Sequence, residues 1–319
     1  LALLCVTQLP ANAGPSLPPE KDPLVQNMDT SVAPGSDFFK YACGKWLKEN
    51  PIPATERGWG IANLVNEETY RQRLVICQDA AASGAAKGSS AQKVGDFWST
   101  GMDSVTIDGQ GALPLKPWLT QLAGIHTRTD LLATLAKFQT LGFGPLYSMF
   151  VGQDEKNSDR YIVHLYQGGI RMPDRDYYFG KDSTTKYVRA EYGKHLVAMF
   201  TLLGEDSARS AASAAAVLKI ETALASRSRT LEQRRDPWAN YNKMSLAQLN
   251  KLTPTIDWAA QFTAMGVPIQ DTVVIGQPEF FKLADSCLSV ARLSEWQAYL
   301  RWNVMTSLAP NLAKEFDQE

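Results

Sequence analysis

The spacing of apolar residues along the chain predicts a mainly helical protein. Residues three or four positions apart lie on the same face of an α-helix, so a repeated spacing of this kind marks the buried face. Such spacing occurs in six segments, marked by Leu64, Tyr70, Leu74, Cys77 and Ala81; Val94, Phe97 and Trp98; Leu131, Leu135 and Phe138; Val188, Tyr192, His195, Met199 and Leu203; Val217, Ile220 and Leu224; and Trp296, Leu300, Val304 and Leu308.

Capping residues indicate where some of these helices begin. Thr129 or Asp130 is a good N-cap for the helix that contains Leu131. Ser245 precedes a short helical segment, and Ser294 with Gln297 has the spacing of a capping box. The sequence therefore predicts helices that begin close to these positions.

One region departs from the helical spacing. In PLYSMFVGQDEKNSDRYIVHLYQGG, apolar and polar residues alternate on both sides of a polar turn. Alternation with a period of two is typical of half-buried strands, so we predict a β-hairpin at about residues 145–166, with strands at 145–151 and 160–166. The predicted fold class is mainly α, a large multi-helix lobe with this one hairpin.

The N-terminal residues suggest export. The chain opens LALLCVTQLPANAGPS, a short apolar run followed by Ala11-Asn12-Ala13. This pattern resembles the end of a secretory signal cleaved after Ala13, although an ordinary apolar N-terminus has the same composition. We expect residues 1–13 to be a signal-peptide remnant, residues 14–36 an extended leader and residues 37–319 one incomplete domain. The expected location is outside the cytoplasm: periplasmic, secreted or anchored facing outward.

Composition and charge exclude some classes of function. The 319 residues include 32 lysines and arginines against 33 aspartates and glutamates. Binding to nucleic acid needs an excess of basic side chains, so a nucleic-acid partner is not expected. No run approaches the roughly 20 apolar residues that span a bilayer, so contact with a membrane is expected only if the N-terminal signal is retained as an anchor.

The residues do not mark an active site or a metal site. His126, His164 and His195 are too far apart in sequence to place two imidazoles on one helical face, and a zinc site needs several such ligands around one ion. A structural role is therefore favoured for each histidine. No Gly-x-Ser-x-Gly motif is present. The arginine cluster at 227–235 is interleaved with acids, which favours a solvated helix end over a polyanion site.

The cysteines are odd in number once the signal is removed. If Cys5 leaves with the signal, Cys43, Cys77 and Cys287 remain. At least one of the three then has no partner within this sequence. For Cys77 and Cys287, burial or a mutual disulfide is more consistent with the sequence than catalysis, because neither has a histidine next to it.

Four segments, in order along the chain, resemble a known family. DFFKYACGKWLKENPIP at residues 37–53 is similar to the N-terminal signature of the neprilysin and endothelin-converting-enzyme family of zinc metallopeptidases. RYIVHLYQGGIRMPDRDYY resembles the family's hairpin and the Gly-Leu-Pro-x-Arg-Asp-Tyr-Tyr turn that follows it. RRDPWANYNKMSLAQLNKL and LSEWQAYLRWNVM resemble two later segments of the same family.

The resemblance implies the N-terminal half of an exported zinc metalloendopeptidase that hydrolyses small peptides in an enclosed cavity between two lobes. Zinc would be bound by a His-Glu-x-x-His helix and a later Glu-x-x-x-Asp helix, and neither motif is in this sequence. No catalytic or metal-binding residue is therefore assigned here. The expected partners are peptide substrates and the chain's own C-terminal catalytic lobe, without which this half would be inactive.

Two residues receive a role from the resemblance. In the family an arginine after the Pro-x-Pro-like turn engages the carboxylate end of a peptide, and Arg57 lies one residue before that place, which Gly58 occupies. Either substrate binding or a structural role on the turn is open for Arg57. Cys43 matches a cysteine that animal members pair with one in the C-terminal half, which implies the same disulfide here. The alternative function is a non-catalytic exported helical protein that binds peptides or acts as a scaffold.

Overall fold

The computed structural model describes residues 22–319. The chain divides into two compact units, one ending at Thr100 and the other comprising Gly101 to Glu319. The expected signal remnant, residues 1–13, lies outside the described residues. Within residues 22–319, none of the helices has both the length and the apolar character needed to cross a bilayer.

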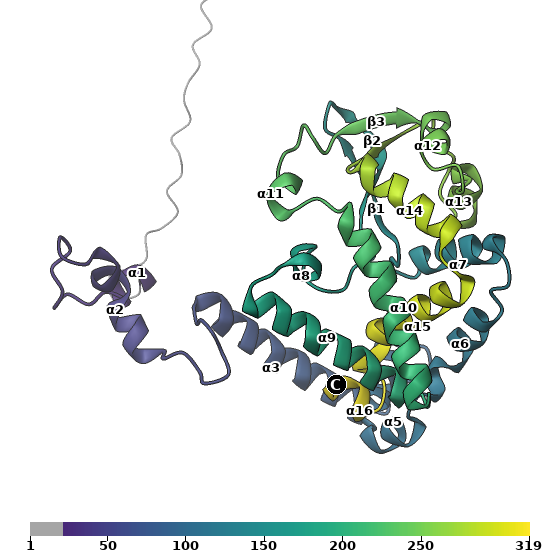
Figure 1. Ribbon diagram of the computed structural model, residues 1–319. Helices are drawn as coiled ribbons and strands as arrows, with labels where there is room; N and C mark the ends of the chain where they lie inside the picture. The colour runs from purple at the N-terminus through teal and green to yellow at the C-terminus, as the bar shows by residue number, and fades with distance from the viewer. Residues whose placement is uncertain (1–21) are drawn as a thin grey trace, which may run out of the picture. The chain divides into compact units, whose positions relative to one another are not determined.

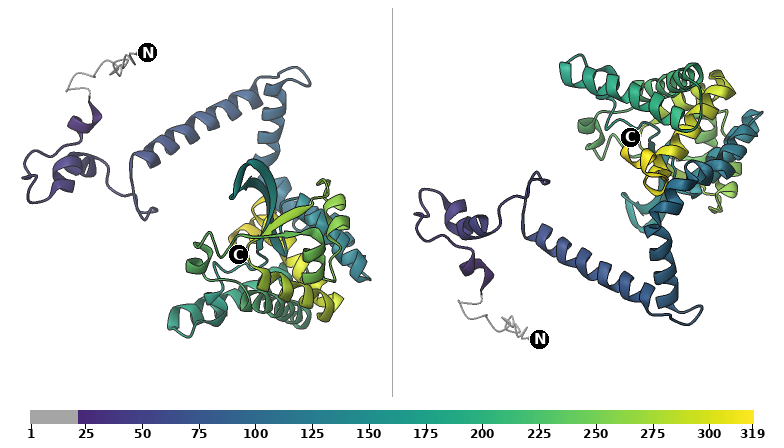
Figure 2. Two further views of the ribbon diagram at one scale, coloured as in Figure 1. Left: turned by 90° about the horizontal axis from the view of Figure 1, so that it is seen from above. Right: turned by 90° about the horizontal axis from the view of Figure 1, so that it is seen from below.

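The N-terminal unit contains helices joined by short turns, α1 (Pro23–Gln26), α2 (Phe38–Glu49), α3 (Ile61–Ala82) and most of α4 (Ser90–Met102). Residues 22–36, expected to be extended, instead form α1 and a turn that packs on α2. The backbone N–H of Asp29 donates to the Tyr41 carbonyl, and its carboxylate binds Lys48 at 2.7 Å. Figure 2 shows α3 as the long helix of this unit, followed by α4 after a turn.

The second unit is mainly helical and contains a small sheet, which lies at the top of the unit in Figure 1. Figure 1 shows α9 and α10 running alongside each other, with α15 close to α10. Its helices, in chain order, are α5 (Ser104–Gln110), α6 (Lys116–Ala123), α7 (Arg128–Thr140), α8 (Asp176–Phe179), α9 (Ser183–Leu202), α10 (Ser207–Ser226), α11 (Leu231–Arg234), α12 (Leu246–Leu252), α13 (Trp258–Ala264), α14 (Pro278–Val290), α15 (Leu293–Leu308) and α16 (Lys314–Gln318), with 3-10 turns at Leu113–Leu115 and Ala309–Asn311.

The sheet has four strands in the order β1-β2-β4-β3. β1 (Tyr147–Asp154) and β2 (Asn157–Gln167) are antiparallel neighbours, which confirms the predicted hairpin. β4 (Thr272–Ile275) runs parallel to β2, and β3 (Asn242–Ser245) pairs antiparallel with β4. β3 and β4 were not predicted, because four residues are too few to establish an alternating pattern.

One large hydrophobic core and one small cluster, formed by Met172, Tyr178 and Ala225, lie in the second unit. Val217, Ile220 and Leu224, the predicted inner face of α10, are all buried, as are the tryptophans of α13 and α15. One face of the sheet contributes Val163 and Leu165 to this core. The predicted fold class is therefore confirmed, with two additional strands.

Some of the observed N-cap residues are the ones predicted from the sequence, and others are not. Ser245 caps α12, and its hydroxyl accepts from the backbone N–H of Gln248. The predicted capping box at Ser294 was wrong by two residues: α15 begins after Arg292, whose backbone N–H donates to the Glu295 carboxylate. Likewise, α7 is capped by Thr127 and not by Thr129 or Asp130. Several polar residues near each start can act as a cap, so sequence alone does not select one.

Candidate functional site

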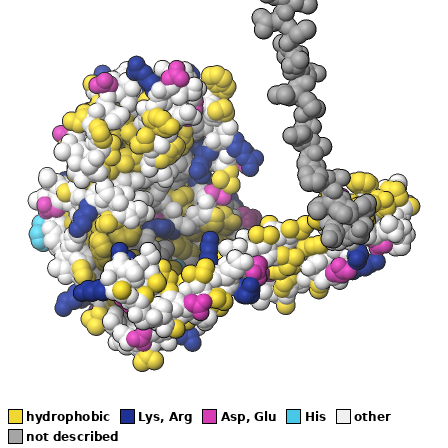
Figure 3. Space-filling model, turned by 180° about the vertical axis from the view of Figure 1, so that it is seen from behind, with side chains coloured by type: hydrophobic (Ala, Val, Ile, Leu, Met, Phe, Trp, Pro, Cys, Tyr) yellow, Lys and Arg dark blue, Asp and Glu magenta, His cyan; other side chains and the backbone are white. Residues whose placement is uncertain are grey.

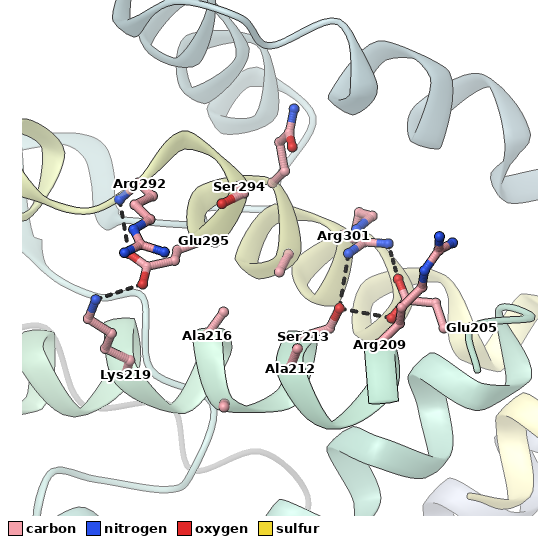
Figure 4. Close-up of a pocket in the computed structure, with 13 residues that line it drawn as sticks. Glu205, Arg209, Ala212, Ser213, Ala216, Lys219, Arg292, Ser294, Glu295 and Arg301 are labelled. Carbon is pink, nitrogen blue, oxygen red and sulfur yellow. Dashed lines mark hydrogen bonds and ion pairs between the residues drawn. The ribbon is translucent and has the colours of Figure 1, made fainter. Parts of the chain in front are cut away.

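A cavity of about 580 Å³ lies between α10 and α15 (Figure 4). Alanines from both helices line it: Ala212, Ala215 and Ala216 of α10, and Ala298 of α15. Each of these side chains is a single methyl group, so the two helices leave space between them at this face. Charged residues surround the alanines, which gives the cavity an apolar floor and a charged rim.

The local sequence explains how these helices begin at the cavity. Asp206 caps α10, and its carboxylate accepts from the backbone N–H of Arg209 at 2.9 Å. Glu295 receives the Arg292 N–H at the start of α15. The alanine-rich sequence that follows Asp206 has a high helix propensity. Its methyl side chains project only a short distance from the helix and leave space beside it. The Asp206 cap, which determines where α10 begins, and the small alanine side chains of α10 together produce the shape of the cavity.

Both carboxylates at the rim are already paired with cations. The Arg301 guanidinium donates to Glu205 and to the Ser213 hydroxyl, and the Ser213 hydroxyl donates to Glu205 at 2.8 Å. Lys219 binds Glu295 at 2.6 Å, and this hydrogen bond is the main cause that lowers the pKa of Glu295. Glu205 and Glu295 are therefore charge-compensated by neighbours within the rim.

Two further arginines give the cavity an excess of positive charge. Arg209 forms an ion pair with the exposed Asp206, at 3.5 Å, and exposed pairs of this kind contribute little energy. Arg292 lies near Glu295 and helps to lower the pKa of that carboxyl, although no ion pair to Arg292 is found among the residues that the structure describes. Four cations and two carboxylates thus line the cavity, a formal excess of two positive charges.

A cluster of hydrogen-bonded side chains around one buried carboxylate lies on the other side of α10. Glu221 is fully buried and accepts hydrogen bonds from the hydroxyls of Tyr178 and Tyr192 at 2.8 to 3.0 Å. The Trp302 indole N–H donates to the Tyr192 hydroxyl at 3.0 Å. Burial raises the pKa of Glu221 to about 7. The cluster ties α8, α9, α10 and α15 together.

The turn containing the Arg-Asp-Tyr-Tyr motif is held by the same cluster. Backbone N–H groups of Arg171 and Met172 donate to the Tyr178 hydroxyl, and the Arg171 guanidinium donates to Asn303 at 2.7 Å. These contacts are all internal to the second unit. The structure therefore assigns the motif an architectural role within this unit.

Arg57 and Cys43, the residues assigned by resemblance, both lie in the N-terminal unit. Arg57 is exposed on the turn after Pro53, and no hydrogen bond or ion pair holds its side chain within residues 22–319. Cys43 lies half-buried in α2. Cys43, Cys77 and Cys287 are all free thiols in the structure.

The histidines occupy three separate environments. His126 is exposed, and His164 is buried in the sheet and stacks on Phe150. His195, in α9, packs against Trp302 of α15. Among residues 22–319, no group of three or more His, Cys, Asp or Glu side chains could hold a metal ion. The described residues therefore do not fit a catalytic zinc ion.

The sequence patterns did not identify the basic residues that line the cavity as site residues. In the cluster at 227–235, which stands out in the sequence, Arg229 is bound by Glu279 at 2.6 Å and serves as an internal cross-link. Arg209 and Arg301 come together only because α10 packs against α15. A basic residue at the start of an alanine-rich helix was the available signal, and by itself it does not distinguish a site from an ordinary surface.

The comparisons with known proteins agree with each other. The profile described as "Peptidase family M13" matches residues 34–319. Neprilysin-3 of Drosophila melanogaster is 29% identical over 314 residues, covering 92% of this chain and 40% of that protein. Endothelin-converting enzyme 1 of Rattus norvegicus is 28% identical, covering 92% of this chain and 39% of that enzyme.

The same relationship is found among solved structures. The zinc metalloprotease Zmp1 of Mycobacterium tuberculosis, in complex with an inhibitor, superposes with a TM-score of 0.79 at 30% identity. The match covers 92% of this chain and 45% of that one. This chain thus spans about 40% of the length of the curated relatives.

Proposed function

Because this chain belongs to peptidase family M13, we propose that it is the N-terminal part of an exported zinc metalloendopeptidase that hydrolyses small peptides in an enclosed cavity. The observation that carries the proposal is the profile match across residues 34–319. The match to a zinc metalloprotease structure over 92% of the chain supports it. In this proposal the zinc ligands belong to sequence that this chain does not contain.

The surface of the N-terminal unit supports a further packing partner. Phe38, Phe39, Ile61, Tyr70 and Phe97 are each more than half exposed. Figure 3 shows hydrophobic side chains gathered over this unit. Exposed apolar patches of this kind commonly mark an interface. We propose that a C-terminal catalytic lobe covers this surface.

The complete reading frame provides the test of the peptidase proposal. We expect its product to contain about one zinc ion per chain, measured by plasma mass spectrometry, and to cleave short peptides in a mass-spectrometric assay. A chelator is expected to abolish cleavage, and added zinc to restore it. The 319-residue chain alone serves as the control and is expected to be inactive. A complete product that binds no zinc and cleaves no peptide would refute the proposal and favour a binding or scaffold protein.

Arg57 is proposed to contact the substrate, because its side chain is exposed and forms no hydrogen bond or ion pair with the described residues 22–319. In the complete enzyme, Arg57→Ala is expected to lower kcat/KM about tenfold or more for peptides with a free C-terminal carboxylate, since a charge-assisted hydrogen bond is lost. Peptides with an amidated C-terminus are expected to be affected much less. Arg73→Ala, an exposed arginine on α3, is the control. Equal specificity constants for wild type and Arg57→Ala would rule out this role.

A further inference from the structure

We propose that the cavity between α10 and α15 binds an acidic peptide segment in an extended conformation. It offers two exposed guanidinium groups: Arg209 is paired with the exposed Asp206 at 3.5 Å, and Arg292 shares Glu295 with Lys219, which binds that carboxylate at 2.6 Å. The surrounding cations outnumber the carboxylates by four to two. This charge is complementary to a ligand that carries carboxylates. The inference does not depend on peptidase activity.

The arrangement of the cavity indicates how such a ligand would lie. In Figure 4, Arg292 lies toward one end and Arg209 toward the other, with Ala212 and Ala216 between them. Lys219 and Arg209 are ten residues apart on α10, which corresponds to about 15 Å along a helix. Lys219 is paired with Glu295 at the Arg292 end. An extended peptide covers about 15 Å in four to five residues. Carboxylates at positions i and i+4 would therefore reach both ends.

The floor of the cavity favours an apolar side chain between the two carboxylates. Ala212, Ala215 and Ala216 present methyl groups there, and side chains i, i+2 and i+4 of an extended peptide point to the same side. A second cavity of about 360 Å³ adjoins the first and shares Glu205, Gln297 and Arg301 with it. Leu119 and Leu203 contribute apolar surface to this second cavity, which extends the groove beyond Arg301.

Arg301 divides the two cavities and is held firmly in place. Its guanidinium bonds to Glu205 and Ser213 and lies over the Phe200 ring at 5.3 Å. Its Nε atom is buried and has no hydrogen-bond partner in the described chain. Arg301 is therefore a fixed positive charge in the middle of the groove, while Arg209 and Arg292 are exposed at the ends and can adjust to a ligand.

The proposal predicts selective binding of the peptide Asp-Ala-Leu-Ala-Asp, acetylated and amidated at its ends and labelled with a fluorophore. Fluorescence anisotropy with the 319-residue chain measures Kd. We expect the Asn-Ala-Leu-Ala-Asn peptide to bind at least tenfold more weakly, because it lacks both carboxylates. Binding of the acidic peptide should also weaken as salt rises, since exposed charges are screened.

Variants of the groove separate specific binding from general attraction. Arg209→Gln and Arg292→Gln are each expected to weaken binding about tenfold, and the double variant about a hundredfold. Ala215→Trp, at an exposed floor position, is expected to block binding by filling the groove. Arg160→Gln removes an exposed arginine of β2 outside the groove and is the matched control. Circular dichroism verifies that each variant is folded.

Any one of four results would overturn the proposal. The wild-type chain could fail to bind the acidic peptide, or bind the neutral one equally well. Arg160→Gln could weaken binding as much as Arg209→Gln and Arg292→Gln do. Ala215→Trp and the double arginine variant could both leave Kd unchanged. None of these results bears on the peptidase proposal, which depends on zinc and cleavage by the complete enzyme.

Discussion

As the pH rises from about 4.5 to about 7, the free energy of unfolding is expected to fall by about 3 kcal/mol through the titration of Glu221 alone. Burial raises the pKa of this carboxyl from its ordinary value of 4.5 to about 7. A pKa difference of one unit between the folded and unfolded chain corresponds to about 1.4 kcal/mol. The raised pKa of Glu221 therefore makes the stability of the second unit sensitive to pH in this range.

The direction follows from proton binding. Between pH 4.5 and 7 the folded chain holds a proton on Glu221 that the unfolded chain has released. The unfolded state therefore binds fewer protons, and stability decreases with rising pH. The contribution is fully present below pH 4.5 and is lost as the pH passes the folded-state pKa of about 7. The hydroxyls of Tyr178 and Tyr192 oppose this shift because they donate to the carboxylate, but desolvation is the larger effect.

Glu221→Gln isolates this contribution, because the amide has nearly the same shape and does not titrate. Urea unfolding followed by circular dichroism at pH 4.5, 6 and 8 gives the free energy at each pH. We expect the wild type to lose about 3 kcal/mol more than Glu221→Gln across this range. Glu191→Gln changes a partly exposed carboxylate of α9 and is the control. Identical pH dependence in wild type and Glu221→Gln would contradict a raised pKa.

The sequence was informative where many residues share one regular environment. The inner face of α10 was predicted from Val217, Ile220 and Leu224 because a long helix packed on a core repeats its apolar residues several times. The hairpin was predicted for the same reason, since both of its strands alternate over several residues. A four-residue strand such as β4 offers no comparable repetition, and its place beside β2 depends on the packing of the whole unit.

The cavity was not predictable from the sequence for a related reason. Arg209 and Arg301 are 92 residues apart, and their proximity to one cavity follows only from the packing of α10 on α15. Nothing in either local sequence distinguishes these arginines from others on the surface. The resemblance to a family did not indicate the cavity either: of its arginines only Arg301 lies in a quoted segment, LSEWQAYLRWNVM, and Arg209 and Arg292 lie in none. The packing of α10 against α15 thus determines which arginines line the cavity, and a local sequence pattern cannot predict that.

The Gly-Gly pair before the Arg-Asp-Tyr-Tyr motif lies in a segment that resembles the family, and the structure gives a physical reason for one of its glycines. Gly169 has a φ of +73°, and a Cβ atom there would lie 2.9 Å from the Pro145 carbonyl oxygen and from the Tyr299 hydroxyl. The Tyr299 hydroxyl in turn donates to the Gly169 carbonyl at 2.6 Å. Glycine is therefore required here both by the backbone conformation and by the close approach of α15.

Gly169→Ala is accordingly expected to lower the free energy of unfolding by about 3 kcal/mol or more. A left-handed conformation costs an alanine about 1 to 2 kcal/mol, and overpacking against buried neighbours adds about 1 to 3 kcal/mol. Gly204 is a matched control, because its φ is +88° and a Cβ atom added there would meet nothing within 4 Å. Gly204→Ala is therefore expected to cost only the conformational part, about 1 to 2 kcal/mol.

The difference between the two variants measures the steric contact with α15 and with the Pro145 backbone. Tyr299→Phe removes the hydroxyl that the new methyl group would meet, so Gly169→Ala should cost less in the Tyr299→Phe background than in the wild type. Part of the cost should remain, because the Pro145 carbonyl is still close. Urea unfolding of the four proteins of this cycle, with Gly204→Ala alongside, gives the coupling energy. Equal losses for Gly169→Ala and Gly204→Ala would show that the turn adjusts freely, and that α15 does not fix the motif in place.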